Sequence, residues 1–253
     1  MIPLHDNVRT RRFPVITVML IAANIAVYII DYLTRHQAIV AQGVDNLGRR
    51  VQYLSDVGGI SAQYSLIPAA ITRDFSHSWP TLFTSIFLHG GFMHIAGNML
   101  YLWIFGNNVE DTLGRPKYIL FYFASGVIAT MAHVATSPAS TTPLVGASGA
   151  IAGLMGAYLI LFPRAEIVTI VPIFIIGTVQ EVPAVIVIGF WAVLQFANAT
   201  WFHSGGMQGG GVAYMAHVGG FLAGILLIIL LGGRRLVKQD RDERPEYGDI
   251  YLR

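Results

Sequence analysis

The sequence predicts an all-α membrane protein: a bundle of six transmembrane helices with a long external loop between helices 1 and 2. Its composition is 54% hydrophobic and only 12% charged, whereas a soluble domain carries roughly 25% charged residues. Six apolar runs approach the length of about 20 residues that a bilayer core requires. Because Lys and Arg gather at the edges of these runs and form no basic stripe, we expect a lipid bilayer as the surroundings and no nucleic acid partner.

The runs follow one another along most of the chain. The predicted spans are residues 13–30, 94–109, 118–135, 147–162, 182–200 and 212–231. The first follows Arg9, Arg11 and Arg12 as a signal peptide would, but it is long and no small-residue cleavage site follows it, so we expect a retained anchor. A seventh run, 167–179, is too short to span and contains Pro172, which predicts an interfacial segment or a buried cap.

The basic residues predict the orientation. With both termini in the cytoplasm, the basic residues of the termini and of the short internal loops lie inside. The two short external loops, 137–146 and 202–211, contain no Lys or Arg. This divides the chain into a cytoplasmic segment 1–12, a membrane domain 13–231 with an external segment 31–93, and a charged cytoplasmic tail 232–253. We expect the tail to be disordered from Arg234 to Arg253. A compact chain of this kind suggests a bacterial inner membrane, although the sequon at 198–200 leaves a eukaryotic membrane open.

Small residues recur every four positions in two of the predicted spans. They are Gly149, Gly153 and Ala157 in the fourth span, and Gly220 and Gly224 in the sixth. This spacing lets two helix backbones approach closely in lipid. We therefore expect the fourth and sixth spans to be neighbours, with generic helix packing as the alternative interpretation.

Polar residues of three different spans lie at the same external end. His94 and Asn98 are four apart near the start of the second span, Ser148 begins the fourth, and His217 lies a turn inside the sixth. At about 1.5 Å per residue, all four lie within roughly 10 Å of that end. Polar side chains buried at one depth on converging helices indicate a functional site.

These residues combine a nucleophile, a base and two donors for a developing anion. Ser148 follows Gly146, and the start of a helix offers unpaired N–H groups. Each residue also has a structural alternative: a serine N-cap, a hydrogen-bonded histidine, or an asparagine that bridges helices. The sequence contains no cysteine, which leaves hydroxyl, imidazole, amide and carboxylate chemistry. We expect no metal and no cofactor.

Three motifs make the chain resemble the rhomboid intramembrane serine proteases over residues 68–231. The first runs from Thr81 through the stretch 89–94 to Asn98 and on through 101–110. The second is 146–150 with Gly153 and 156–158, and the third is 216–221 with Gly224. They occur in the order of that family, which has a six-helix core.

The resemblance implies a role for each matching residue. Ser148 would be the nucleophile and His217 the general base, without an acidic third member. The side chains of His94 and Asn98, with the backbone N–H of Ser148, would bind the oxyanion. Structural residues near the site would be Gly146, Gly149, Gly220, Gly224, Glu110 and His89. The implied partners are transmembrane protein substrates.

Two departures from the family pattern leave open how the imidazole and the first loop are held. Ala152 stands where many members carry an aromatic that packs on the catalytic histidine, and Trp79 precedes Pro80 where members often have Arg. Two other functions stay open: a non-catalytic rhomboid-like protein that binds client helices, and a transporter. A transporter would be expected to show broken helices in inverted repeats and charges at mid-membrane, which the sequence does not display.

Overall fold

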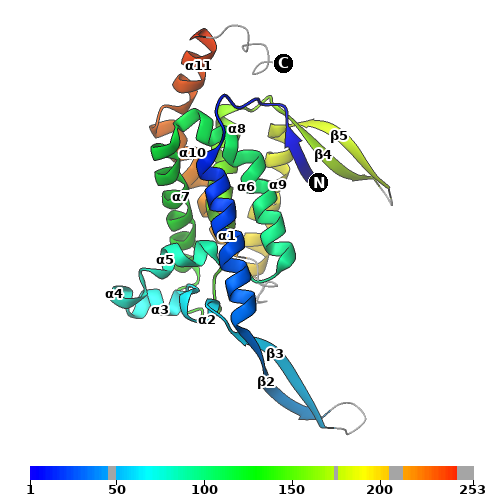
Figure 1. The fold of residues 1–253 in the computed structure, drawn as a ribbon, viewed down its shortest axis with the longest axis vertical. Coiled ribbons are helices and arrows are strands. Elements are labelled where there is room, and N and C mark those ends of the chain that lie inside the picture. Colours follow the sequence, from blue (N-terminus) through cyan, green and yellow to red (C-terminus); the bar gives the residue numbers. More distant parts are fainter. Residues whose placement is uncertain (45–49, 174–175, 205–212, 244–253) are drawn as a thin grey trace.

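The computed structural model describes residues 1–44, 50–173, 176–204 and 213–243, and most of them are helical (Figure 1). Six long helices form the body of the molecule: α1 (Val15–Thr34), α6 (Phe92–Leu113), α7 (Arg115–Thr136), α8 (Ser148–Leu161), α9 (Ala184–Ser204) and α10 (Tyr214–Leu230). Each corresponds to one of the six apolar runs. The bounds of the helices differ by a few residues from those of the runs.

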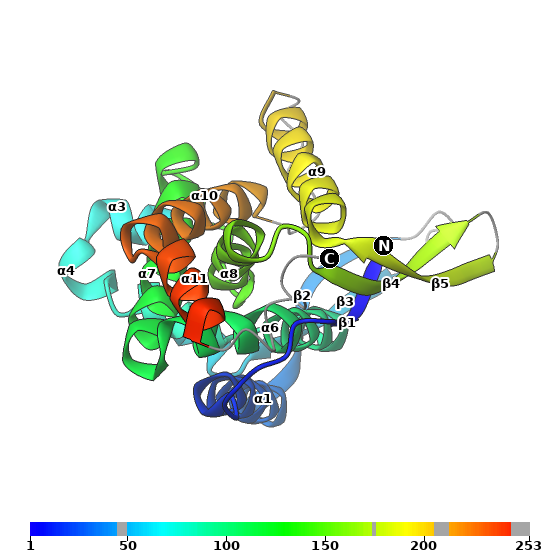
Figure 2. The same cartoon turned by 90° about the horizontal axis from the view of Figure 1, so that it is seen from above.

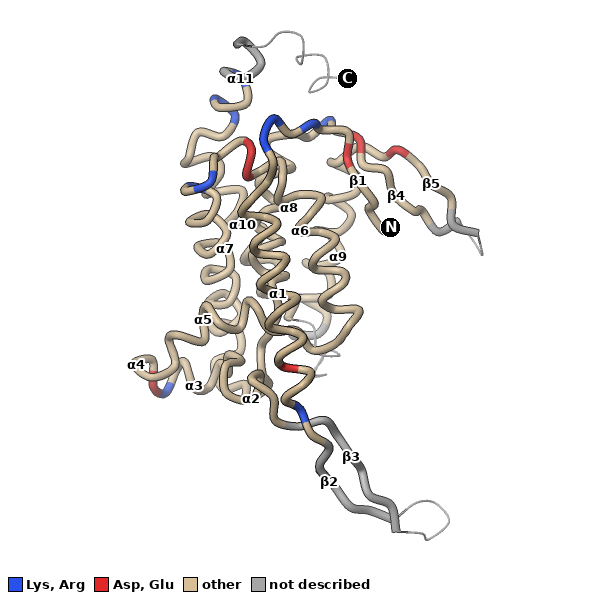
Figure 3. Tube along the Cα trace, viewed as in Figure 1, with Lys and Arg blue, Asp and Glu red and all other residues tan. Residues whose placement is uncertain are grey.

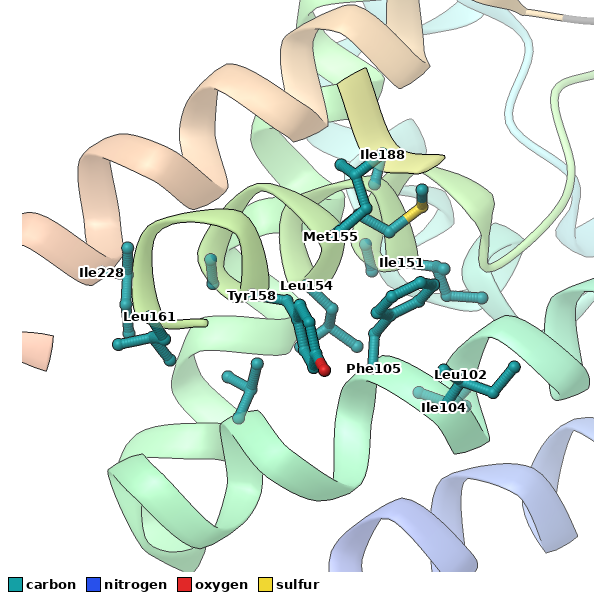
Figure 4. Packing of buried hydrophobic residues seen from close by; sticks show 14 of the residues in the cluster. Leu102, Ile104, Phe105, Ile151, Leu154, Met155, Tyr158, Leu161, Ile188 and Ile228 are labelled. Atoms are coloured by element: carbon teal, nitrogen blue, oxygen red, sulfur yellow. The ribbon is translucent and has the colours of Figure 1, made fainter. Parts of the chain in front are cut away.

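Helix α8 lies at the centre of the body (Figure 2). It packs most extensively on α10, then on α7 and α6, while α1 packs on α6. Gly149 to Tyr158 are all buried, which requires a helix that is apolar all round. The surrounding core includes Phe105 of α6, Ile188 of α9 and Ile228 of α10 (Figure 4). Helix α9 runs obliquely to the others (Figure 2).

By length and apolar composition, three of the described helices could cross a membrane. They are α1, α7 and α9. Helix α8 has 14 residues and is about 21 Å long, shorter than a hydrocarbon core of roughly 30 Å. Its burial among neighbouring helices accounts for a short helix at the centre of the bundle.

A buried carboxylate joins the N-terminus of α1 to α6. Glu110 accepts hydrogen bonds from the backbone N–H groups of Ile16, at 3.0 Å, and Thr17, at 2.8 Å, and from the Thr17 hydroxyl at 2.8 Å. The first N–H groups of a helix have no partner within the helix. Glu110 therefore caps α1.

The segment between α1 and α6 is structured. It contains a hairpin of β2 (Arg35–Val44) and β3 (Arg50–Gly58), four short helices, namely α2 (Ser61–Tyr64), α3 (Pro68–Arg73), α4 (Phe75–Ser78) and α5 (Thr81–Thr84), and the 3₁₀ turn η1 (Ser85–Phe87). Buried Asp31 at the end of α1 pairs with Arg35 and accepts a hydrogen bond from the Ser61 N–H at 2.7 Å. Residues 31–93, predicted as a long loop, therefore contain strands and short helices.

The opposite end of the bundle carries a three-stranded antiparallel sheet of β1 (Ile2–Asp6), β4 (Glu166–Ile173) and β5 (Ile176–Pro183), in the order β1-β4-β5. The short apolar run 167–179 therefore forms a β-hairpin. Its many β-branched residues favour a pleated strand, and hydropathy alone does not separate a short buried strand from a helix. Together with β2 and β3, this sheet corrects the prediction of an all-α protein to a mostly helical one.

The predicted tail is also partly ordered. Helix α11 (Gly233–Glu243) follows α10 and makes contacts with α6 and α8. The expectation of disorder from Arg234 onward is wrong for this helix, and the rest of the tail lies outside the described residues. The external loop predicted at 202–211 also falls mostly outside them.

Candidate active site

The connection from α7 to α8 is held in place before it reaches Ser148. Leu66 and Leu144 exchange two backbone hydrogen bonds, of 3.2 and 2.7 Å, and the Gly146 N–H donates to the Ser85 carbonyl at 2.9 Å. Gly146 has φ +126°, a conformation that L residues with a side chain rarely adopt. Ser148 then becomes the first residue of α8. The glycine thus permits the sharp turn that places the serine at the helix start.

Ser148 and His217 are in hydrogen-bond contact. Their Oγ and Nε2 atoms are 2.8 Å apart, and both side chains are partly accessible. The contact depends on the close packing of α8 on α10, where a Cβ added to Gly220 would lie 2.1 Å from the Gly149 carbonyl oxygen. The predicted proximity of the fourth and sixth spans is confirmed.

His94 and Asn98 of α6 lie on the side of that helix that faces Ser148 and His217. A Cβ at Gly146 would lie 2.9 Å from His94 Nε2 and 3.6 Å from Ser148 Oγ. The Gly90 N–H points at His94 Nδ1 over 3.4 Å, which favours the tautomer that carries its proton on Nε2. Asn98 is buried, and its Nδ2 has no hydrogen-bond partner.

A cavity of about 640 Å³ contains all four groups. Its lining includes His94, Asn98, Gly146, Ser148 and His217. Because His94 is also solvent-exposed, the cavity is open to the outside. A buried amide donor without a partner is costly unless something else accepts its hydrogen bond. The cavity thus presents a hydroxyl, an imidazole in contact with it, and two N–H donors to a polar group bound there.

Two further residues of the predicted site, His89 and Glu110, lie apart from the contact between Ser148 and His217. His89 is buried, its ring is edge-on to that of His94 with centroids 5.2 Å apart, and its carbonyl accepts from Arg35 at 3.4 Å. Burial, helped by the neighbouring His94, lowers the pKa of His89 to about 4. Glu110 caps α1 at the other end of α6. Among the described residues, no group of three His, Asp or Glu side chains could hold a metal ion.

One contact of the site was missed by the reasoning from sequence. Gln195 of α9 places its Oε1 atom 2.8 Å from Nδ1 of His217. Trp191, one turn earlier on α9, lies with its ring 5.9 Å from the imidazole at an interplanar angle of 36°. Ala152 is buried in α8 and has no ring to pack on His217. An aromatic ring from a different helix, that of Trp191, lies beside the imidazole instead. A glutamine within a mostly apolar span was the available signal.

A family comparison matches most of the bundle. The model of the rhomboid domain matches residues 76–234, which contain all four cavity groups. The matched region runs from α4 into α11 and leaves β1, α1 and the β2–β3 hairpin outside.

Curated relatives are similar over about 60% of this chain. The putative rhomboid protease YdcA of Bacillus subtilis is 32% identical over 60% of this chain and 67% of its own length. The rhomboid protease GluP of the same organism is 37% identical over 61% of this chain but 31% of its own length. Rhomboid protein 1, a mitochondrial protein of Saccharomyces cerevisiae, is 30% identical over 62% of this chain and 43% of its own length.

Proposed function

This chain belongs to the rhomboid family and is an intramembrane serine protease, and we propose that Ser148 is its nucleophile and His217 its general base. The observation that carries the assignment is the 2.8 Å contact between Ser148 Oγ and His217 Nε2 within an open cavity. A nucleophile and a base within hydrogen-bond reach are the common feature of serine hydrolases on unrelated folds.

The dyad carries out acyl transfer in two halves. Ser148 Oγ attacks the carbonyl carbon of the substrate while His217 Nε2 accepts the hydroxyl proton. The same proton then passes to the leaving amine nitrogen as the peptide bond breaks. A water molecule attacks the resulting ester, gives its proton to Nε2, and Ser148 is released when its oxygen recovers that proton. Water must therefore reach the site, which an open cavity provides.

The oxyanion of the tetrahedral intermediate would be bound by Asn98 Nδ2, His94 Nε2–H and the backbone N–H of Ser148. The first is a buried donor without a partner, and the second lies beside Gly146. The third belongs to the first turn of α8, where N–H groups have no acceptor within the helix. Such fixed donors stabilise the transition state more than the ground state.

The wider setting follows from the same assignment. The substrates are transmembrane proteins, and α6, α8 and α10 cross the bilayer together with α1, α7 and α9. Both termini face the cytoplasm and the cavity opens to the external side, in a bacterial inner membrane. The distribution of basic residues supports this orientation. We expect substrates whose helices unwind easily near that side, since an intact helix buries its carbonyls in hydrogen bonds.

Two substitutions test the assignment with a graded outcome. Ser148→Ala is expected to abolish cleavage of a transmembrane model substrate and labelling by a fluorophosphonate probe. Asn98→Ala is expected to lower kcat by about 100- to 1,000-fold, since it removes one oxyanion donor, while labelling continues slowly. Equal cleavage by the wild type and Ser148→Ala would refute the proposal. Wild-type protein that binds helices but resists the probe would instead support a non-catalytic binder.

A further inference from the structure

The imidazole of His217 is held from a third helix. Its Nε2 faces Ser148 of α8, while its Nδ1 faces Gln195 of α9, each at 2.8 Å. Both ring nitrogens of His217 therefore have a hydrogen-bond partner, and the two contacts connect α10 to α8 and to α9. Trp191 on the same face of α9 and Tyr214 on α10 place rings 5.9 and 6.4 Å from it.

The identity of the atom that Gln195 presents determines the tautomer of His217. An amide oxygen only accepts, so Nδ1 must carry a proton to make this hydrogen bond. A neutral imidazole protonated on Nδ1 has its lone pair on Nε2. That lone pair is the one required to take the proton of Ser148. The opposite tautomer would leave Nε2 protonated and unable to act as a base.

The other groups around His217 do not supply this acceptor. Its titratable neighbours on adjoining helices are His94 of α6 and His133 of α7, both imidazoles, and Tyr214 lies on its own helix. Within the described part of the chain, no carboxylate contributes to the electrostatic surroundings of His217. In a Ser-His-Asp triad, an acidic residue contacts Nδ1 of the histidine. Here the neutral amide of Gln195 makes that contact.

We propose that Gln195 is a positioning residue of the protease, which accepts the Nδ1–H of His217 and so fixes the imidazole in the tautomer and orientation that activate Ser148. The inference rests on the proposed roles of Ser148 and His217. An amide stays uncharged, so Gln195 orients the ring without the charge stabilisation that a carboxylate adds to a protonated imidazole. Because Gln195 lies on α9, the base is correctly held only while α9 stays against α10.

The first test compares two substitutions at Gln195. Gln195→Met keeps the length of the side chain and removes the acceptor, and it is expected to lower kcat by about 10- to 100-fold with little change in KM. Gln195→Glu restores an acceptor, so it should recover most of that loss. Because a carboxylate stabilises the protonated imidazole, this variant should also shift the acidic limb of the kcat/KM profile to higher pH.

The matched control is Gln180→Met, the same change at an exposed residue of β5, which is expected to leave kcat and the pH profile unchanged. A purely structural role for Gln195 predicts a different pattern, in which Gln195→Glu is as impaired as Gln195→Met and shows no displaced pH limb. That pattern would overturn the proposal. Wild-type kcat and pH profile in Gln195→Met would overturn it as well.

A spectroscopic test separates this inference from the proposed function. In ¹⁵N-histidine-labelled protein, with His217 assigned from a His217→Ala sample, the wild type is expected to show a protonated Nδ1 and an unprotonated Nε2. Gln195→Met is expected to show a mixture of tautomers. An unchanged tautomer would refute the role of Gln195 whatever the activity. Full cleavage by Ser148→Ala would refute the assigned nucleophile, while the ¹⁵N spectra would still decide whether Gln195 holds His217.

Discussion

At the scale of single residues, glycines bring the side chains of Ser148 and His217, the proposed dyad, together. A Cβ at Gly224 would lie 1.9 Å from the Gly153 carbonyl oxygen, and one at Gly220 would lie 2.1 Å from that of Gly149. Gly149 follows Ser148 directly, and Gly220 is three residues from His217. Any side chain at these positions must push α8 and α10 apart, and the dyad spans those same two helices.

We predict that Gly224→Ala destabilises the protein by about 1–3 kcal/mol, as overpacked interiors generally do, and also slows labelling of Ser148. The contact is with backbone atoms, which cannot rotate away. The matched control is Gly189→Ala on α9, where an added Cβ meets nothing within 4 Å and where alanine favours the helix. Thermal unfolding and probe labelling report the two effects. Equal behaviour of the two variants would contradict this account of the α8–α10 contact.

Residue spacing predicted four of the groups that line the cavity but did not predict Gln195, which contacts His217 from α9. His94, Ser148 and His217 occur close to the start of their helices, so one depth argument brought them together. Helix α9 runs in the direction opposite to α6, α8 and α10. A residue of α9 near the cavity therefore lies in the second half of its helix, as Gln195 does. Since α9 is apolar over most of its length, the sequence does not say which face turns toward α10. Only the packed structure shows that Gln195 meets Nδ1 of His217.

At the scale of elements, strand β1 is held to the end of the bundle by Asp6. The Asp6 carboxylate accepts from the Tyr158 hydroxyl of α8 at 2.5 Å and from Asn108 Nδ2 of α6 at 2.6 Å. The strand also pairs with β4. Burial raises the pKa of Asp6 to about 6, against the smaller opposing effects of the Tyr158 and Asn108 hydrogen bonds and of the neighbouring His5.

This contact predicts a pH dependence of stability. An acid whose pKa is raised by folding holds more protons in the native than in the unfolded state between the two pKa values. The free energy of unfolding should therefore fall as pH rises from about 4 to about 6, by at most about 3 kcal/mol from this residue. Asp6→Asn mimics the protonated acid and should flatten that part of the profile. Thermal unfolding between pH 4 and 7 measures it.

Glu181→Gln is the matched control, because Glu181 is an exposed carboxylate of β5 in the same sheet. It should retain the pH dependence of the wild type. If Asp6→Asn keeps the full wild-type slope while it folds normally, the contact of β1 does not titrate in this range.

Hydropathy did not predict the sheet of β1, β4 and β5 at this end of the bundle. The run 167–179 and the first residues of the chain meet in one sheet, where Ile2 opposes Ile170 and Asp6 opposes Ile167. Pairing between strands more than 150 residues apart leaves no local pattern to read. The six long helices, in contrast, each follow from a local apolar run.

At the scale of the whole molecule, the two ends of the bundle differ in how many Lys and Arg residues they carry (Figure 3). The end with β1 and α11 carries most of the described Lys and Arg residues, in the N-terminal segment, at the start of α7 and in α11. At the other end, the described basic residues are Arg35, which pairs with Asp31, Arg50, which begins β3, and Arg73, which precedes Asp74. The bias follows the rule that basic residues flank the cytoplasmic ends of spans.

This asymmetry predicts which side of the membrane each end faces, and the absence of cysteine allows a direct test with single-cysteine variants. Thr142→Cys lies in the connection that leads to Ser148, and Lys238→Cys lies in α11; both positions are exposed. A membrane-impermeant maleimide should label Thr142→Cys in intact spheroplasts and Lys238→Cys only in inverted vesicles. Retained cleavage activity confirms that each variant is folded, and detergent-solubilised protein, where both should react, serves as the control.

The opposite labelling pattern would place the cavity on the cytoplasmic side. Substrate helices would then have to present their scissile bonds from that side, and the charge bias would have failed as a guide to orientation. The expected pattern places Ser148 and His217 on the external side, since the connection before Ser148 and the start of α10 lie at the same end as Thr142. The labelling result therefore determines from which side water and substrate reach the dyad.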